Sequence, residues 1–326
     1  MAQVKYFQAV RDGLANAMRE DPDTILFGED VAQPGGIFAQ TRGLQDEFGA
    51  QRVFDTPAGE TGFMGAAVGA ALTGLRPIVE ISFADFFPAC MDQVVNQMAK
   101  IRYMSGGQAA LPVTVLSFGG GGLNAGPQHS GMYDAWLGSL PGIKTVAPAS
   151  SDDVAGLIRT AVRDPDPVFV LMHKGLLQSR AEIPEDGPEL VPLGRARIRR
   201  AGTDITIVCW SGSVRPCLTA ADELAGSGIE AEVVDLRSIQ PLDLDTILDS
   251  VVKTGRLLAV SEVTGFCGVT AEVVAAVTRD AFDFLDAPPD RVTAPFTPVP
   301  MSPPLERFVI PDAGDVVAAA RRLVTR

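Results

Sequence analysis

The sequence predicts an α/β protein of two doubly wound domains, a parallel-sheet domain followed by a smaller α/β domain. Short apolar strand patterns alternate with helical patterns along almost all of the 326 residues. This order is typical of parallel sheets covered by helices on both faces. The alternation breaks once, over residues 179–200. We therefore place a first domain at residues 1–178, a linker at 179–200 and a second domain at 201–326.

The first domain is predicted to open with an amphipathic helix over residues 3–20. Asp85 is a candidate N-cap for a long helix that runs to about Met104, with Pro88 in the first turn, where proline is tolerated. The remaining elements follow from short apolar runs and from helical periodicity. Strands are expected at 24–27, 52–54, 77–81, 112–117, 144–146 and 168–172, and helices at 41–48, 61–75 and 151–163.

The linker is rich in proline, acids and arginine, and it shows neither a helical nor a strand period. We expect no regular structure there. After it the alternation resumes and predicts the second domain. Strands are expected at 204–210, 230–236, 256–261 and 290–294, and helices at 215–226, 243–253, 269–282 and 314–325.

The composition is that of an ordinary folded protein, with 46% hydrophobic and 21% charged residues. The formal net charge of −13 argues against a nucleic-acid binder, which needs a basic face. The longest apolar helical run, residues 61–75, is shorter than the ~20 residues of a bilayer span, and the chain does not open with an apolar signal segment. The four cysteines lack CxxC spacing. We expect a cytoplasmic protein with reduced thiols that binds neither nucleic acid nor membrane.

The stretch from Val53 to Gly74 joins a strand, a Pro/Gly turn and an uncharged helix rich in glycine and alanine. Glycine costs a helix roughly 1 kcal/mol relative to alanine, so these glycines indicate that something packs close to the backbone. Glu60 stands at the start of this helix. It is either an acid favoured there by the helix dipole, or a carboxyl in a dry site whose raised pKa suits acid–base work.

A second uncharged stretch runs from Tyr103 to Tyr133 and contains the glycine run 119–122. Charges are costly to bury, so this stretch is expected to lie against other protein or a ligand. A merely neutral, flexible loop is the alternative. His129 lies near the end of the stretch, in a loop that follows a strand, where ligands collect in parallel sheets.

The sequence contains two histidines, His129 and His173. Imidazole titrates near neutrality, and the loop position makes His129 the better candidate for proton transfer. A loop-stabilising hydrogen bond is the alternative for His129, and a partly exposed strand end for His173. No HExxH, no GxxxxGK[ST] and no GxGxxG after the first strand occurs. Motifs for histidine-bound zinc and for common nucleotide sites are therefore absent.

Ordered motifs along almost the whole chain mark a family. They include Gly28-Glu29-Asp30-Val31, Arg52-Val53-Phe54-Asp55-Thr56-Pro57, Gly74-Leu75-Arg76-Pro77-Ile78-Val79-Glu80, Gln128-His129-Ser130 and Asp235-Leu236-Arg237. With them the chain resembles the β subunit of the thiamine-diphosphate-dependent decarboxylating component of 2-oxo acid dehydrogenases. That family acts on pyruvate, acetoin or branched-chain substrates and belongs to the transketolase-like superfamily. The resemblance implies a pyrimidine-binding domain followed by a transketolase C-terminal-like domain.

The resemblance also implies roles for individual residues. Glu60 matches the glutamate that hydrogen-bonds N1′ of the aminopyrimidine and promotes removal of the thiazolium C2 proton. Phe86 matches the aromatic residue that packs on the aminopyrimidine, and Gly59 takes the place of the usual small residue before the glutamate. His129 matches the histidine near the substrate and the incoming lipoyl group. Glu60 and His129 are thus the expected catalytic residues, and Glu60, Phe86 and Gly59 the expected cofactor contacts.

The expected cofactor is thiamine diphosphate with Mg²⁺, whose diphosphate and metal are held mainly by an α subunit. This chain has neither the Gly-Asp-Gly nor the Asn-Asn sequence that would hold them. The family also implies a possible K⁺ site near Thr114, Asp164 and Asp166. The expected partners are the α subunit, in a heterotetramer of two α and two β chains, and the lipoyl domain and core of a dihydrolipoyl acyltransferase.

Two departures from the family touch the substrate side. After His129 and Ser130 the chain has Gly131 in place of glutamine, and Gly59 precedes the glutamate. The substrate is therefore left open among pyruvate, the favoured one, acetoin and branched-chain 2-oxo acids. The context of Ala135-Trp136 and Asp286-Ala287-Pro288 leans toward pyruvate or acetoin over branched-chain 2-oxo acids. The alternatives to this function are the carboxyl-terminal half of a split transketolase and a non-catalytic assembly paralogue.

Overall fold

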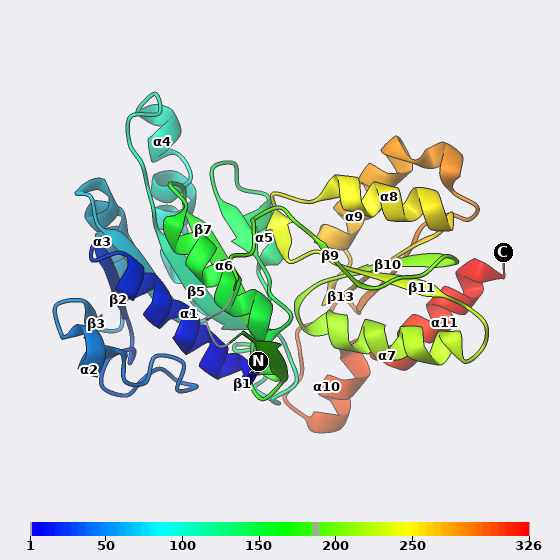
Figure 1. Ribbon diagram of the computed structural model, residues 1–326, viewed down its shortest axis with the longest axis horizontal. Helices are drawn as coiled ribbons and strands as arrows, with labels where there is room; N and C mark the ends of the chain where they lie inside the picture. Colours follow the sequence, from blue (N-terminus) through cyan, green and yellow to red (C-terminus); the bar gives the residue numbers. More distant parts are fainter. Residues whose placement is uncertain (1, 185–188, 326) are drawn as a thin grey trace.

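The computed structural model describes residues 2–184 and 189–325, which form two sheet domains lying side by side (Figure 1). The larger sheet has seven strands in the order β12-β6-β7-β5-β4-β2-β3. Its strand pairs are parallel except for β12 with β6. The strands are β2 (Thr24–Gly28), β3 (Val53–Asp55), β4 (Arg76–Phe83), β5 (Thr114–Gly119), β6 (Lys144–Val146), β7 (Val168–His173) and β12 (Ser238–Gln240).

Both faces of this sheet are covered, so its central strands are buried throughout. Every residue of β5 and β7 is buried, as expected for parallel strands packed on two sides. The helices α1 (Tyr6–Glu20) and α6 (Ser151–Arg163) cover the face that includes Leu26. The opposite face packs against α3 (Glu60–Leu72).

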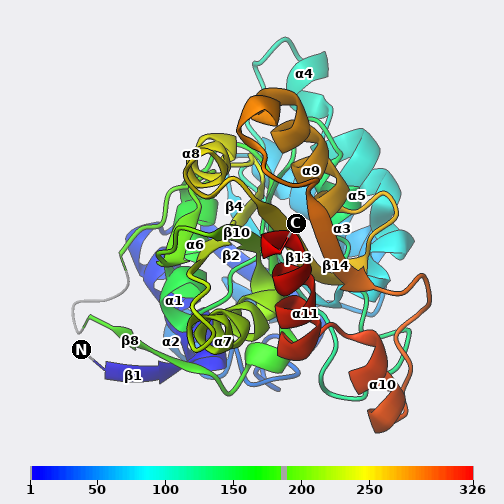
Figure 2. The ribbon, with the colours of Figure 1, turned by 90° about the vertical axis from the view of Figure 1, so that its right-hand side faces the viewer.

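The second domain repeats this arrangement around five strands in the order β14-β13-β10-β11-β9, of which only the β9–β11 pair is antiparallel. The sheet lies between two pairs of helices (Figures 1 and 2). One pair is α7 (Val214–Ala225) with α11 (Ala313–Val324), and the other is α8 (Leu244–Thr254) with α9 (Val269–Asp280). The strands are β9 (Arg197–Arg200), β10 (Ile205–Cys209), β11 (Ala231–Asp235), β13 (Leu257–Thr264) and β14 (Asp290–Ala294).

The expected long helix from Asp85 to Met104 is wrong. The segment is broken into a 3₁₀ helix η1 (Ala84–Cys90), a π-helix η2 (Gln93–Met98) and a short α4 (Ile101–Met104). Pro88 lies inside η1, where its missing N–H removes one of the hydrogen bonds that an α-helix needs. Asp85 does not cap a helix here, and its carboxylate binds another loop instead.

Short elements at the edges of the sheets were also not expected. The first helix begins at Tyr6, because residues 2–5 form β1 (Ala2–Lys5), which pairs antiparallel with β8 (Arg180–Ile183). The expectation of no regular structure over 179–200 is wrong, since that segment contains β8 and β9. A further helix, α10 (Pro303–Val309), precedes the last one.

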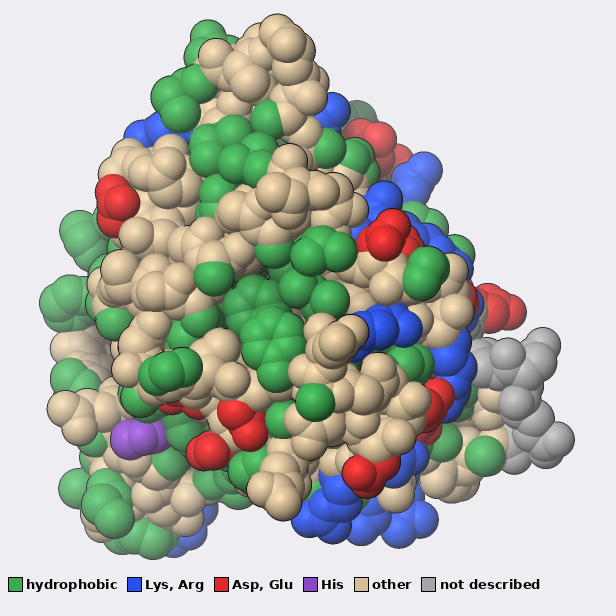
Figure 3. All heavy atoms as spheres, turned by 90° about the vertical axis from the view of Figure 1, so that its left-hand side faces the viewer, with side chains coloured by type: hydrophobic (Ala, Val, Ile, Leu, Met, Phe, Trp, Pro, Cys, Tyr) green, Lys and Arg blue, Asp and Glu red, His purple; other side chains and the backbone are tan. Residues whose placement is uncertain are grey.

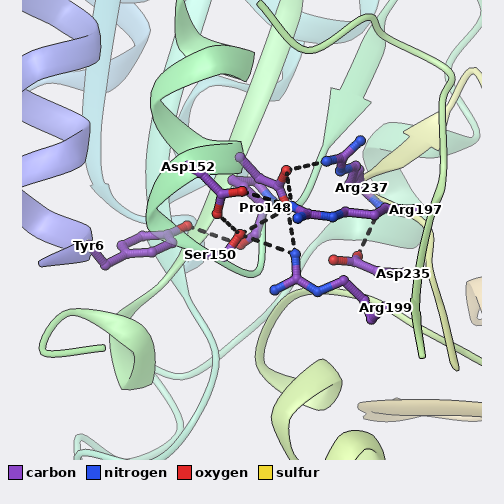
Figure 4. A network of polar contacts seen from close by, with 9 residues as sticks. Tyr6, Pro148, Ser150, Asp152, Arg197, Arg199, Asp235 and Arg237 are labelled. Carbon is purple, nitrogen blue, oxygen red and sulfur yellow. Dashed lines mark hydrogen bonds and ion pairs between the residues drawn. The ribbon is translucent and has the colours of Figure 1, made fainter. Parts of the chain in front are cut away.

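Buried polar contacts join the two domains (Figure 4). Asp153 on α6 is fully buried and pairs with Arg237 at 2.5 Å and with Arg199 at 3.2 Å. Further from this cluster, the indole Nε1 of Trp210 donates to Asp134 at 2.9 Å. Because the partners come from both domains, these contacts fix how the second domain sits on the first.

None of the helices in residues 2–184 and 189–325 has the length and apolar character needed to span a bilayer.

Candidate active site

Glu60 lies at the carboxyl-terminal edge of the first sheet, as the first residue of α3, just after β3. Its side chain is half-buried in this chain. The preceding Gly59 donates its N–H to Oε1 of Glu29 at 3.2 Å, and Glu29 directly follows β2. Burial raises the pKa of Glu29, and the charge of Glu60 adds to that shift. The ends of two neighbouring parallel strands thus place two carboxylates close together.

His129 is held in an aromatic cluster. Its ring meets Phe83 edge to face, with centroids 4.6 Å apart, and Phe86 in the same manner at 5.8 Å. Phe83 ends β4 and Phe86 lies in η1. Edge-to-face contacts of this kind stabilise aromatic pairs beyond their buried area. The predicted residues Phe86 and His129 are therefore in contact, and Phe83 is a third member that sequence reasoning did not single out.

The helix η1 connects the neighbourhoods of Glu60 and His129. The hydroxyl of Thr61, next to Glu60, donates to the carbonyl of Ala89 near the end of η1. Burial raises the pKa of Cys90 to about 12, with the charge of Glu60 as the next contribution. At the start of the same helix Phe86 contacts His129. One short helix therefore contacts His129 and the residue next to Glu60.

The loop that carries His129 is anchored by main-chain contacts. The ammonium of Lys174, a fully buried side chain that follows β7, donates to the carbonyls of Gly120 and His129 and to Oγ of Ser130 at 3.1 Å. Burial lowers the pKa of Lys174. Asp85, in η1 of the same domain, accepts the N–H of Gly131 at 3.0 Å. The sequence had suggested a helix cap for Asp85 and no role for Lys174, whose only signal was a lysine directly after a buried strand.

His173 has a structural position that differs from the expected one. It is 5% exposed, and its Nε2 lies 2.8 Å from Glu262 on β13 of the second domain. Its Nδ1 accepts the N–H of Gly175 at 3.0 Å. The expectation of a partly exposed strand end is wrong, because the second domain packs over the end of β7.

The residues named for a K⁺ site have other partners in this chain. Lys144 lies 2.7 Å from Asp164 and 3.3 Å from Asp166, and Asp166 also binds Arg102 at 2.5 Å. The hydroxyl of Thr114 is buried without a hydrogen-bond partner. Among the described residues, no group of three or more His, Cys, Asp or Glu side chains could hold a metal ion. Any K⁺ here would depend on main-chain carbonyls.

One side of the glycine-rich helix α3 is exposed to solvent in this chain. Its outward residues are exposed, uncharged and mostly small: Thr61, Gly62, Gly65, Ala66, Gly69 and Leu72. Figure 3 views the first domain from the side of α3, and hydrophobic side chains gather over the middle of that face while lysines and arginines lie mainly toward its edges. In the second uncharged stretch Tyr103 is 90% exposed. Both stretches thus present apolar surface outward.

Comparison with known proteins decides the family. Residues 2–180 match the family model of the transketolase pyrimidine binding domain, and residues 194–316 match that of the transketolase C-terminal domain. The chain is 44% identical to the β subunit of acetoin:2,6-dichlorophenolindophenol oxidoreductase from Bacillus subtilis (strain 168), over 97% of this chain and 96% of that protein. It is also 44% identical to the pyruvate dehydrogenase E1 component subunit beta of the same organism, over 99% of each chain.

The chain belongs to this family of transketolase-like E1 β subunits. Among solved structures, a split-gene transketolase described as an inactive β4 tetramer matches with a TM-score of 0.78 and 24% identity, over 98% of this chain and 97% of that chain. At that identity the match shows the fold alone. The predicted α/β architecture, a pyrimidine-binding parallel-sheet domain followed by a smaller transketolase C-terminal-like domain, is confirmed.

Proposed function

We propose that this chain is the β subunit of a 2-oxo acid dehydrogenase decarboxylating component, with pyruvate as the favoured substrate. The observation that supports it most is the half-built site. The helix η1 contacts Thr61, next to Glu60, and the ring of His129, whereas the described residues include no group of three or more His, Cys, Asp or Glu that could hold a metal ion. An α subunit in a heterotetramer of two α and two β chains would supply the diphosphate and Mg²⁺ contacts.

Thiamine diphosphate would supply the electron sink for decarboxylation. In this chain Glu60 would hold a proton at N1′ of the aminopyrimidine, Phe86 would pack on that ring, and Gly59 would leave room beside it. His129 would move a proton near the substrate and the lipoyl group. The proposed overall reaction converts a 2-oxo acid and a lipoyl disulfide into carbon dioxide and an acyl-dihydrolipoyl thioester, so the disulfide is the oxidant.

The proposed partners beyond the α subunit are the lipoyl domain and the core of a dihydrolipoyl acyltransferase, in the cytoplasm. A K⁺ ion near Thr114, Asp164 and Asp166 remains part of the proposal, as do the domain boundaries at 178 and 201. Acetoin cleavage is a second candidate function, because the 44% identity to an acetoin oxidoreductase β subunit equals the identity to the pyruvate dehydrogenase one.

The test is to produce the chain together with an α subunit of the same family and to supply thiamine diphosphate, Mg²⁺ and a lipoyl domain. Pyruvate, 2-oxobutyrate, 3-methyl-2-oxobutanoate and acetoin are compared by kcat/KM for lipoyl acylation. Pyruvate is expected to give the highest value. Acetoin as the best substrate would favour the second candidate, and no turnover of any of the four would overturn both.

A further inference from the structure

The loop from Gly119 to Gly131 contains His129 near its end and has no Asp, Glu, Lys or Arg of its own. Its backbone is nevertheless contacted by charged groups from outside the loop. Glu306 on α10 is 3% exposed, and its Oε1 accepts the N–H of Gly122 at 3.0 Å. Both of its carboxylate oxygens accept the N–H of Asn124, at 3.1 and 3.2 Å. The second domain thus holds Gly122 and Asn124 through the carboxylate of Glu306, and Glu262 also accepts a backbone hydrogen bond from the neighbouring Gly121.

A cation holds the same loop from the first domain. Lys174 donates to the carbonyls of Gly120 and His129. Glu306 lies close enough to favour the charged form of Lys174. The peptide N–H groups therefore point to an anion and the peptide carbonyls to a cation. Hydrogen bonds to charged groups are roughly twice as strong as neutral ones, so this pair defines the course of the loop.

Gly121 and Gly126 pack against Ile310 and Met301 of the second domain, but the packing is incomplete, because a cavity of about 200 Å³ lies between other parts of the loop and that domain. Pro127 and Gly131 line it on the loop side, and Thr264 and Ile310 on the other. A loop without close packing on one side depends on its polar contacts for a single position. Two of the contacted residues, Gly122 and Asn124, also adopt left-handed conformations, with φ of 92° and 54°.

We propose that Glu306 is a positioning residue that acts through the loop to fix His129 against Phe83 and Phe86. This inference rests on the proposed function of His129. The hydrogen bonds of Glu306 go to the backbone of the loop, and Glu306 sits in the second domain. Its removal frees residues 122–124, so that the His129 ring samples positions away from the aromatic cluster while Lys174 still holds the end of the loop.

The test uses the fact that the full chain has two histidines. Labelling with ¹³C-histidine gives two imidazole signals, and His129→Ala assigns them. In Glu306→Gln the His129 signal is expected to shift and broaden clearly more than the His173 signal. His173 packs against Gly120 of the same loop but is also held by Glu262. The matched control is Glu272→Gln, which removes an exposed carboxylate on α9 and is expected to leave both signals unchanged.

The second measurement is lipoyl acylation by the complex with the α subunit. Displacements near 1 Å can cost on the order of a hundredfold in rate, so kcat in Glu306→Gln is expected to fall about ten- to a hundredfold, with KM for the 2-oxo acid within about twofold. Glu306→Asp, which keeps the charge but shortens its reach, is expected to give a smaller change of the same kind. It provides the test if Glu306→Gln does not fold.

A His129 signal that stays unchanged in a folded Glu306 variant would overturn the proposal. So would a variant that melts earlier than the parent but acylates at the parental rate per folded molecule, since Glu306 would then only stabilise α10. The signal does not depend on catalysis. A parent complex without acylation, in which the His129 signal still responds to Glu306, would therefore contradict the proposed function and leave the positioning contact intact.

Discussion

Glu60 is half-buried in the single chain, although its proposed role requires the carboxyl to meet a ring nitrogen in a site shielded from water. Its position explains part of this. The first residue of a helix that starts at a sheet edge faces the open end of the domain, where ligands bind in folds of this class. The cofactor and a second chain would complete the cover, so the environment of Glu60 is expected to change on assembly.

The prediction for this residue concerns Glu60→Gln in the complex with the α subunit. The amide keeps the shape of the side chain but cannot exchange a proton with N1′, and general acid–base groups contribute typically 10²–10⁴-fold. Exchange of the cofactor's C2 proton for deuterium should slow by about that factor while the subunits still associate. Glu272→Gln serves as the control. Exchange at the parental rate would rule out the proposed role of Glu60.

Some contacts between individual side chains were predicted from the sequence, and others were missed for a physical reason. Phe86 and His129 were both named and lie in contact. Lys174 was not named, although it holds the His129 carbonyl from 45 positions along the chain. A contact between such distant segments depends on which strands become neighbours, and residue pattern alone does not fix that order. The pairing of β5 with β7 brings the two together.

Among the elements, α3 was correctly expected as a helix, but the close packing predicted at its glycines is not found within this chain, where no atom lies within 4 Å of a Cβ placed on Gly62 or Gly69. Its glycines and alanines predicted close packing against the backbone. The structure places Phe63, Met64 and Val68 inward, while the small residues face outward. The uncovered side is then the expected contact surface for the α subunit. The 85–104 segment failed by the same method, because a π-helix and a proline within a 3₁₀ turn leave no distinct periodicity.

The prediction for α3 uses Ala66→Leu on its exposed side. A leucine there keeps helix propensity and meets solvent in the single chain, so the melting temperature of the isolated chain should shift by less than about 2 °C. Association with the α subunit, measured by calorimetry, should weaken at least about tenfold. The matched control is Ala318→Leu, an exposed position on α11 at the far end of the molecule (Figure 1). Equal affinities for the two variants would place the α subunit elsewhere.

In the whole molecule, the contact between the domains contains a carboxyl with an unusual titration. Asp235 ends β11, is fully buried, and has a pKa raised to about 7 by burial and by the charge of Asp153, against the opposing effect of Arg199. Its unfolded pKa is about 3.9. Between these two values the folded chain binds a proton that the unfolded chain does not. The free energy of unfolding therefore falls as pH rises from about 4 to about 7.

Asp235→Asn removes this titration. The urea midpoint of the variant minus that of the parent should increase from pH 5.5 to pH 7 and level off above about pH 7.5. Buried Glu80 and Asp134 also have raised pKa values, but they are present in both proteins and cancel in the difference. Asp283→Asn, at an exposed position, is the control and should show no such trend. Parallel curves for Asp235→Asn and the parent would contradict the assignment.

The two-domain architecture was the most predictable property of the molecule, because periodicity reports strands and helices that are buried on known faces. The contacts between the two domains were not predictable in this way. The strand β12 comes from the second half of the sequence and pairs antiparallel with β6 of the first sheet. A three-residue edge strand is too short to give a period, and its partner is set only when the domains pack.

The isolated chain is expected to carry only part of the binding site for thiamine diphosphate. The described residues include Glu60, Phe86 and Gly59, which the proposed function places beside the aminopyrimidine, but no group of three or more His, Cys, Asp or Glu that could hold a metal ion. Mg²⁺ prefers carboxylate and carbonyl oxygens together with substrate phosphates, so the diphosphate would remain unbound by this chain. The purified chain should therefore bind thiamine diphosphate and Mg²⁺ weakly and should not decarboxylate pyruvate. Addition of the α subunit should restore both.

Calorimetric titration of the isolated chain with thiamine diphosphate, with and without Mg²⁺, provides the measurement. The α subunit alone and the mixed subunits are titrated under the same conditions, because a site shared between chains binds tightly only in the mixture. A dissociation constant of roughly 1 µM corresponds to about 8 kcal/mol, more than the aminopyrimidine contacts of half a site should provide. Binding of that strength by the isolated chain would show that it holds a complete site of its own, and the two-chain site would have to be abandoned.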